Sequence, residues 1–207
     1  MKEAIKQTIR TFSDSSTSRS RQPDFIESIE IIRERARKNI DDGAVTDGYK
    51  ADRNAVISLL NDALATELVC ELRYKRHHFM ATGLNAMPAA EEFLEHANEE
   101  QAHADSLAER IVQLGGEPDF SPAELSSRSH SEYVAGDTLR EMMREDLVAE
   151  RIAIDTYGQI IRYIGDGDPT TRRLLEDILA NEEEHADDLA GMLRRNESME
   201  KAGSSAS

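Results

Sequence analysis

The sequence contains a single cysteine, Cys70, among 207 residues, and no tryptophan. One cysteine excludes an internal disulfide and fits a reducing compartment, and we expect Cys70 to be a small buried apolar side chain. No apolar run approaches the roughly 18 residues of a membrane-spanning helix, and the first residues lack the uninterrupted apolar segment of a secretory signal. We therefore expect a soluble, cytoplasmic protein that makes no contact with a membrane.

Basic residues are also scarce, because 25 Lys and Arg stand against 41 Asp and Glu, for a net charge of −16. This balance argues against binding nucleic acid through overall charge, and it suits either the handling of cations or solubility alone. Aromatic residues make up only 5% of the chain, whereas Ala, Glu, Leu and Arg, which favour helices, are plentiful. Nothing in the sequence reads as a strand, so we predict an all-α protein.

Four long helical patterns predict the body of the protein. They run from about residue 52 to 81, from Pro88 to Gly115, from Thr138 to Gly165 and from Asp168 to about Arg195. Thr138 and Glu141 are spaced as a capping box, and Asp168-Pro169 matches a cap followed by a first-turn proline. Around this body, 52–195, we expect a flexible tail over 1–22, a helix and linker over 23–51, and a flexible tail over 196–207.

The lengths of the connections predict the topology. About six residues join the first and second helices and about three join the third and fourth, so each pair is antiparallel. Residues 116 to about 137 are long enough to run the length of the bundle, which lets the second and third helices lie parallel. We predict a four-helix bundle with one long crossover connection and an extra N-terminal helix.

The two helical pairs repeat one acidic pattern. The segments "ANEEQAHADSL" (97–107) and "ANEEEHADDL" (180–189) each contain a Glu-x-x-His motif. In each half a lone glutamate precedes this motif by 33 or 32 residues, and a tyrosine follows the lone glutamate by seven. The first half has Glu67, Tyr74, Glu100 and His103, and the second has Glu150, Tyr157, Glu182 and His185. The sequence therefore contains a two-fold repeat of a helical hairpin.

The spacing of these residues predicts a dinuclear metal site. Residues three apart on a helix share a face, so each Glu-x-x-His pair points in one direction. A lone glutamate from each of two helices and a Glu-x-x-His from each of the other two converge in the core of a ferritin-like bundle. Four buried carboxylates need compensating charge, which two divalent metals supply. Carboxylate and imidazole ligands favour iron, with manganese and zinc as substitutes, over metals that prefer sulfur.

Four stretches of the chain resemble the ferritin superfamily, most closely the bacterioferritins. They are "LNDALATELVCELRY", "EEQAHADSLAERI", "REDLVAER" and "DILANEEEHADDL", and the likeness covers about residues 52–195. The resemblance implies that Glu67 and Glu150 are terminal ligands and that Glu100 and Glu182 bridge two irons. It also implies one imidazole for each iron, from His103 and His185. Tyr74 falls where the family keeps a tyrosine beside the centre, as a hydrogen-bond partner or one-electron donor, and an ordinary core tyrosine is the equal alternative.

Two departures from the bacterioferritin pattern bear on haem and on assembly. Gln101 stands where haem-binding members have a methionine, which argues against haem. The chain ends about a dozen residues after the fourth helix, without the fifth helix that lines a pore of 24-subunit cages. The resemblance then favours the twelve-subunit, Dps-like mini-ferritins with a bacterioferritin-type centre, and a 24-mer is the alternative.

The activity that the resemblance implies is oxidation of Fe(II) to Fe(III) by O₂ or H₂O₂ at the paired irons, for iron storage and protection from oxidative stress. A peroxidase, catalase or oxygenase on the same site is one alternative. A non-catalytic, DNA-protecting assembly is another, although the acidic body opposes DNA binding by the five basic residues of the tail. A third alternative is that the subunits are cargo in a larger shell.

Outside the motif, we expect His96 on the surface rather than in an accessory iron site, and His77 and His78 in solvent.

Overall fold

The computed structural model describes residues 27–83 and 86–204, with side chains up to Ser198, and every regular element in these ranges is helical. The chain divides into two compact units at Lys38 and Asn39. The first unit contains α1 (Ile29–Arg35). The second contains a 3-10 turn (Ile40–Asp42), α2 (Arg53–Met80), α3 (Met87–Gln113), α4 (Leu125–Arg128), α5 (Leu139–Ile164) and α6 (Pro169–Ser204). The all-α prediction is therefore confirmed, and no helix of the described chain is both long and apolar enough to cross a membrane.

The helices begin where local side chains satisfy the free backbone amides of a first turn. The Asp52 carboxylate accepts from Ala55 N at the start of α2. Thr138 and Glu141 form both bonds of the predicted capping box at the start of α5. At the start of α6, Asp168 Oδ1 accepts a hydrogen bond from Thr171 N over 2.9 Å, and Pro169 is the first residue of the helix. The caps of α5 and α6 were predicted from the sequence, because each depends on residues that lie close together in the chain.

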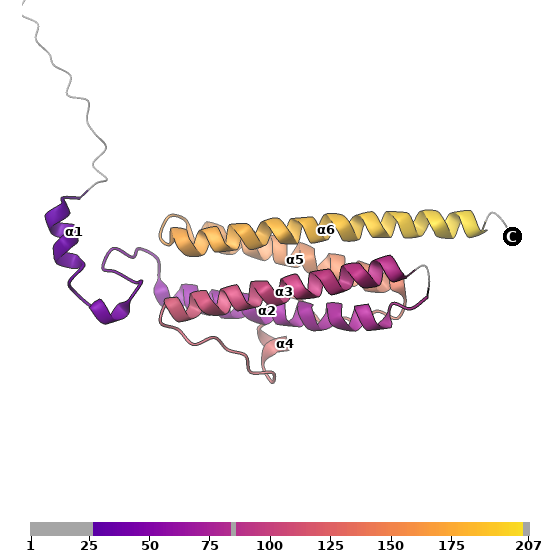
Figure 1. Ribbon diagram of the computed structural model, residues 1–207, viewed down its shortest axis with the longest axis horizontal. Coiled ribbons are helices and arrows are strands. Elements are labelled where there is room, and N and C mark those ends of the chain that lie inside the picture. The colour runs from indigo at the N-terminus through magenta and orange to yellow at the C-terminus, as the bar shows by residue number, and fades with distance from the viewer. Residues whose placement is uncertain (1–26, 84–85, 205–207) are drawn as a thin grey trace, which may run out of the picture. The chain divides into compact units, whose positions relative to one another are not determined.

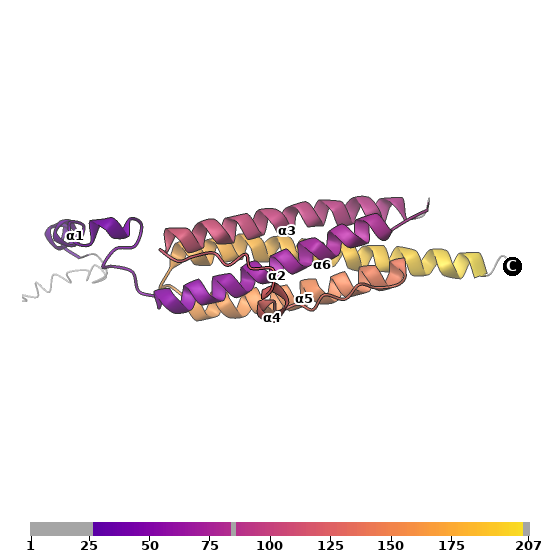
Figure 2. The ribbon, with the colours of Figure 1, turned by 90° about the horizontal axis from the view of Figure 1, so that it is seen from below.

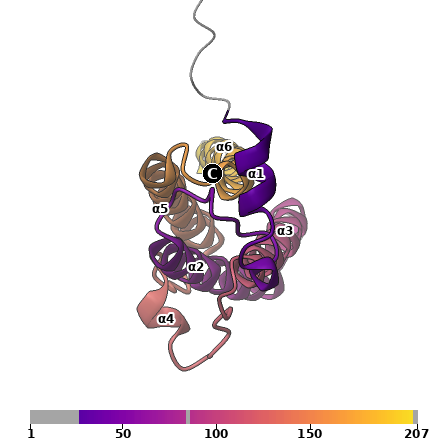
Figure 3. The same cartoon turned by 90° about the vertical axis from the view of Figure 1, so that its left-hand side faces the viewer.

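The four long helices form a bundle with the predicted crossover connection. Helices α2 and α3 pair with each other, as do α5 and α6, and the pairs meet through α2 with α5 and α3 with α6 (Figures 1 and 3). At one end, Lys50 N donates to Gly167 O and the Arg53 guanidinium to Leu114 O. At the other end, Met80, Gly83 and Ala86 line one pocket together with Asp137 and Met142. The chain between α3 and α5, which includes α4, therefore runs the length of the bundle (Figure 2).

A buried network of ion pairs and hydrogen bonds connects the bundle to the crossover segment between α3 and α5. Arg73 Nε of α2 donates to Asp146 Oδ1 of α5 over 2.8 Å, and its Nη1 donates to the backbone oxygen of Glu132 over 3.0 Å. His77 lies 2.7 Å from the same aspartate through Nδ1 and donates from Nε2 to Ala135 O. His77 is fully buried, so the expectation that it is solvated is wrong. The sequence could not show this, because the aspartate lies 69 residues away.

The bundle core has a charged layer between two apolar layers. One apolar cluster includes Leu60, Leu64, Leu107, Ile111 and Leu175, and the other includes Tyr74, Phe93, Met143, Leu189 and Met192. The predicted metal ligands lie between these clusters along the helices and are buried with them. The apolar layers therefore carry the packing of the bundle and hold the charged layer out of water.

Two helices differ in length from the sequence prediction. The N-terminal helix, predicted within 23–51, covers only the seven residues of α1, and none of these seven is buried. Helix α6 continues to Ser204 instead of ending near Arg195, so the tail predicted at 196–207 is helical through most of its length. Residues 196–202 contain neither Gly nor Pro, so nothing local ends the helix there. The predicted tail at 1–22 lies outside the described residues.

Candidate metal centre

All six predicted ligands meet in the middle of the bundle. Helices α2 and α5 each contribute one glutamate, and α3 and α6 each contribute a Glu-x-x-His pair. Five of the side chains belong to residues that are only 1% exposed and the sixth, His103, to one that is 8% exposed. Their oxygen and nitrogen atoms form two clusters, each within 4.8 Å, which are Glu67, Glu100, His103 and Glu182, and Glu100, Glu150, Glu182 and His185.

Glu100 and Glu182 belong to both clusters, and each turns one oxygen toward each histidine. Glu100 Oε2 lies 3.8 Å from His103 Nδ1, and Glu100 Oε1 lies 3.6 Å from His185 Nδ1. Glu182 Oε1 lies 3.1 Å from His103 Nδ1, and Glu182 Oε2 lies 3.5 Å from His185 Nδ1. This geometry offers two candidate cation positions that share both carboxylates, and each candidate position also has its own glutamate and imidazole.

Several buried polar atoms in the two clusters have no hydrogen-bond partner in the described chain. They are both carboxylate oxygens of Glu100 and of Glu182, Glu150 Oε2 and His185 Nδ1. Leaving buried polar atoms unpaired is costly, and carboxylates are the costliest of them. These atoms all belong to residues of the two clusters, so the donor set fits a pair of divalent metals that prefer oxygen and imidazole ligands.

Protonation in this layer is strongly perturbed. Burial, followed by repulsion from a neighbouring carboxylate, raises the pKa of Glu67 to about 8 and holds the pKa of Glu150 well above its ordinary value. Burial by itself lowers the pKa of both histidines, but the surrounding carboxylates prevail and raise the pKa of His103 above its usual range and that of His185 to about 12. Without metal, protons supply part of the positive charge that the four carboxylates need.

Two tyrosines donate hydrogen bonds to the lone glutamates across the bundle. Tyr74 of α2 donates from its hydroxyl to Glu150 Oε1 of α5, and Tyr157 of α5 donates over 2.5 Å to Glu67 Oε1 of α2. Each hairpin therefore positions the glutamate of the other. The predicted site included Tyr74 but not Tyr157, although both follow a lone glutamate by seven residues in the repeat. That shared spacing was the signal for the second tyrosine.

Two further side chains adjoin the centre. Glu99 Oε2 lies 2.6 Å from His185 Nε2, which leaves Nδ1 of the imidazole directed at the carboxylates. His96, expected on the surface, is buried, and its ring stacks on His185 with centroids 4.0 Å apart. Burial, with the nearby His185 adding, lowers the pKa of His96 to about 3, so this imidazole is neutral. Cys70 is buried, as expected.

Comparison with known proteins places this geometry in context. A family model described as the ferritin-like domain matches residues 57–199. Bacterioferritin from Desulfovibrio desulfuricans is 31% identical over 140 residues, covering 67% of this chain and 74% of that protein. A solved structure of D. desulfuricans bacterioferritin, whose diiron site was captured in different catalytic states, matches with a TM-score of 0.63 and 26% identity, covering 70% of this chain and 82% of that one.

Two other proteins are similar to the chain over a comparable range. A nutrient stress-induced DNA-binding protein from Nostoc is 34% identical over 139 residues, covering 66% of this chain and 76% of that protein. A dodecameric thioferritin from Bacteroides fragilis, a bacterioferritin-related protein, matches with a TM-score of 0.71 and 30% identity, covering 74% of this chain and 92% of that one. The predicted fold and the resemblance read from the four helices are confirmed by these matches.

Proposed function

The chain belongs to the ferritin-like family, and we propose that it oxidises Fe(II) to Fe(III) at the six-residue centre, for iron storage and protection against oxidative damage. The observation that carries this proposal is the pair of shared carboxylates. Glu100 and Glu182 each direct one oxygen toward His103 and the other toward His185, so two Fe(II) ions would be held side by side. Glu67 with His103 would complete one position and Glu150 with His185 the other.

Paired binding suits a two-electron oxidant. Metals about 3.5–4 Å apart can both face one oxidant molecule, and each Fe(II) gives up one electron. With H₂O₂, two electrons and two protons break the O–O bond and yield two waters. With O₂ as the oxidant, two electrons and two protons yield H₂O₂. The protein would supply position and charge, since its carboxylates stabilise Fe(III) more strongly than Fe(II).

The tyrosines and Glu99 would keep the ligands in this arrangement. Tyr74 and Tyr157 each hold one oxygen of a lone glutamate, which leaves the other oxygen for metal. Glu99 fixes the ring orientation of His185. Such outer partners typically change metal affinity or activity by about 10–100-fold when removed.

Assembly into a closed homo-oligomer accompanies the proposed storage function. The thioferritin of B. fragilis, 30% identical to this chain, is dodecameric. We propose a dodecamer here as well, which size-exclusion chromatography with light scattering would test. A mass near twelve chains of 23.2 kDa supports this assembly, whereas a monomer or a 24-mer contradicts it.

Addition of Fe(II) to the demetallated protein in air tests the ferroxidase proposal. The expected result is a rapid rise in ferric absorbance that saturates at two irons for each chain in the first turnover. Replacing the iron with Mn(II) and adding H₂O₂ distinguishes catalase activity from ferroxidase activity. Steady peroxide breakdown with manganese, and iron oxidation no faster than in buffer, would contradict the proposal.

Metal binding is expected to release protons and to strengthen as the pH rises. Metal binds the deprotonated forms of the ligands, but the pKa of Glu67 is raised to about 8 and those of Glu150, His103 and His185 are raised too. Near pH 7 the metal must therefore displace protons, and a higher pH lowers that cost. Titration calorimetry with Mn(II) in buffers of different ionisation enthalpy measures the release. A binding enthalpy independent of the buffer, or affinity that falls between pH 6 and 8, would contradict this expectation.

A further inference from the structure

A second group of potential metal ligands lies outside the six-residue centre. Glu92 and His96 are one turn apart on α3, and Asp188 comes from α6. One ligand atom from each of the three lies within 4.8 Å of the other two. None of these residues belongs to the duplicated Glu-x-x-His motifs, and the ferroxidase proposal does not use them.

His96 is the member of this group that most needs a partner. Its side chain is only 3% exposed, yet its Nδ1 has no hydrogen-bond partner in the described chain. Its Nε2 lies 3.6 Å from Glu92 Oε1, which is too long for a hydrogen bond but leaves room for both atoms to approach one cation. Neither ring nitrogen of His96 therefore makes a hydrogen bond within the described residues, which is uncommon for a buried histidine, and Nε2 is the nitrogen that faces Glu92.

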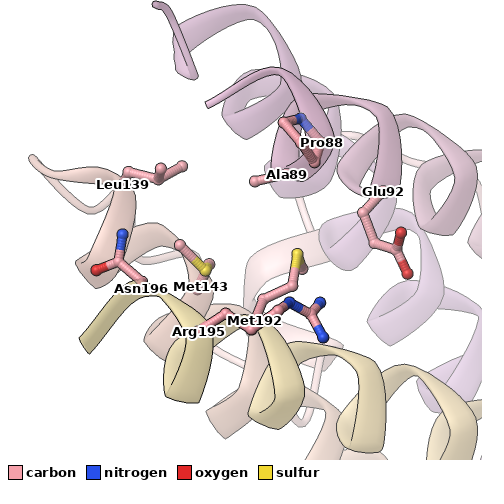
Figure 4. A pocket seen from close by; sticks show the side chains of 8 residues that line it. All are labelled: Pro88, Ala89, Glu92, Leu139, Met143, Met192, Arg195 and Asn196. Carbon is pink, nitrogen blue, oxygen red and sulfur yellow. The ribbon is translucent and has the colours of Figure 1, made fainter. Parts of the chain in front are cut away.

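The two carboxylates add negative charge at the same place. Burial, and then the charge of Asp188, raises the pKa of Glu92, so the two acids lie close enough to repel each other. Arg195 offsets part of this repulsion, and its side chain extends toward Glu92 in Figure 4. Two carboxylates and an imidazole together form a mixed oxygen and nitrogen donor set of the kind that takes iron, manganese or zinc.

The group also lies between the proposed paired-metal centre and a surface pocket. On one side, the His96 ring stacks on the ligand His185 with an interplanar angle of 20°. On the other side, Glu92 lines a pocket of about 220 Å³ together with Met143, Met192 and Arg195 (Figure 4). Asp188 is exposed and Glu92 is partly exposed, so a hydrated cation can reach this group without first opening the core.

We propose that Glu92, His96 and Asp188 form a third metal site, which binds a divalent transition cation at the pocket side of the centre. Three protein ligands leave coordination positions for water, as expected of a site that metal enters and leaves. Binding of a metal here stands independently of the ferroxidase proposal. The use of the site to pass Fe(II) toward His185 rests on that proposal.

Zinc binding to the demetallated full-length protein tests the site, because zinc suits these ligands and is not oxidised. We expect three zinc ions for each chain by elemental analysis and calorimetry, and a zinc anomalous peak between the three residues in crystals. His96→Ala should leave two ions and weaken the third binding event at least about 100-fold. Asp188→Asn acts from the other helix, away from the histidine stack, and should weaken the same event about 10-fold.

Matched controls separate a built site from general acidity. Asp187→Asn removes the same charge from the adjacent exposed position and should leave three ions bound. Arg195→Gln removes a competing cation and should tighten the third event several-fold. The double variant Glu100→Ala with Glu182→Ala should keep one zinc ion, at the third site. Two zinc ions in the wild type, or equal losses in Asp187→Asn and Asp188→Asn, would overturn the site.

The relay role has a separate kinetic readout. At low Fe(II), Asp188→Asn should slow oxidation about 10-fold, whereas at saturating Fe(II) its rate should approach that of the wild type. Equal slowing at every Fe(II) concentration would overturn the relay. Three bound zinc ions without any iron oxidation would contradict the ferroxidase proposal and support the third site. Iron oxidation with only two bound zinc ions would contradict the third site and support the ferroxidase proposal.

Discussion

Glu100→Ala is expected to lower the rate of Fe(II) oxidation by at least about 100-fold and to abolish binding at both positions of the paired centre. Glu100 turns an oxygen toward each histidine, so its loss removes a ligand from both cation positions at once. Loss of an outer partner alone typically costs 10–100-fold, and loss of a shared ligand should cost more. Stopped-flow absorbance after mixing Fe(II) with aerated protein measures the rate.

The lone glutamates provide a sharper contrast. Glu67 belongs to one cluster and Glu150 to the other, so Glu67→Ala or Glu150→Ala should remove a single metal and leave the second position occupied. Glu183→Ala is the matched control, because Glu183 is adjacent to the shared Glu182 but exposed. It should oxidise iron at the wild-type rate. Identical stoichiometry in Glu67→Ala and Glu100→Ala would show that the carboxylates are not shared as the geometry indicates.

Asp146→Ala is expected to destabilise the protein by about 3–5 kcal/mol, the cost of leaving one partner of a buried ion pair uncompensated. Arg73, Asp146 and His77 are all at most 1% exposed, and the aspartate contacts both of the others. At roughly 2–4 °C for each kcal/mol in a domain of this size, the melting temperature should fall by about 6–20 °C. Differential scanning calorimetry at one protein concentration measures the shift.

The matched control is Asp155→Ala, which removes an exposed aspartate from the same helix and should leave the melting temperature unchanged. Asp146→Leu combined with Arg73→Met should recover much of the loss, because apolar residues can replace a buried pair of similar volume. Equal melting temperatures for Asp146→Ala and Asp155→Ala would mean that the network does not hold the crossover to the bundle.

The bundle and the candidate ligands could be predicted because their signals are local and repeated. The caps at Thr138 and Asp168 need only residues three apart, and each Glu-x-x-His pair shares a helix face by the same rule. The matched distance from each lone glutamate to its motif then identified all six side chains that the structure brings together. No long-range information was needed, because a bundle with short hairpin loops permits few arrangements of four helices.

The features that were missed depend on contacts between distant segments. The burial of His77 depends on Asp146, which lies 69 residues away on another helix. The burial of His96 depends on the packing of α3 against α6 beside His185, which sequence spacing alone does not specify. Helical periodicity indicates which residues share a face, but not what that face meets.

The most direct test of the paired-metal centre is anomalous diffraction at the iron edge from crystals soaked anaerobically in Fe(II). Two strong peaks about 3.5–4 Å apart are expected between the Glu100 and Glu182 carboxylates, one near His103 Nδ1 and one near His185 Nδ1. A single peak, or iron bound only at surface acids with the six side chains unliganded, would contradict the existence of the centre.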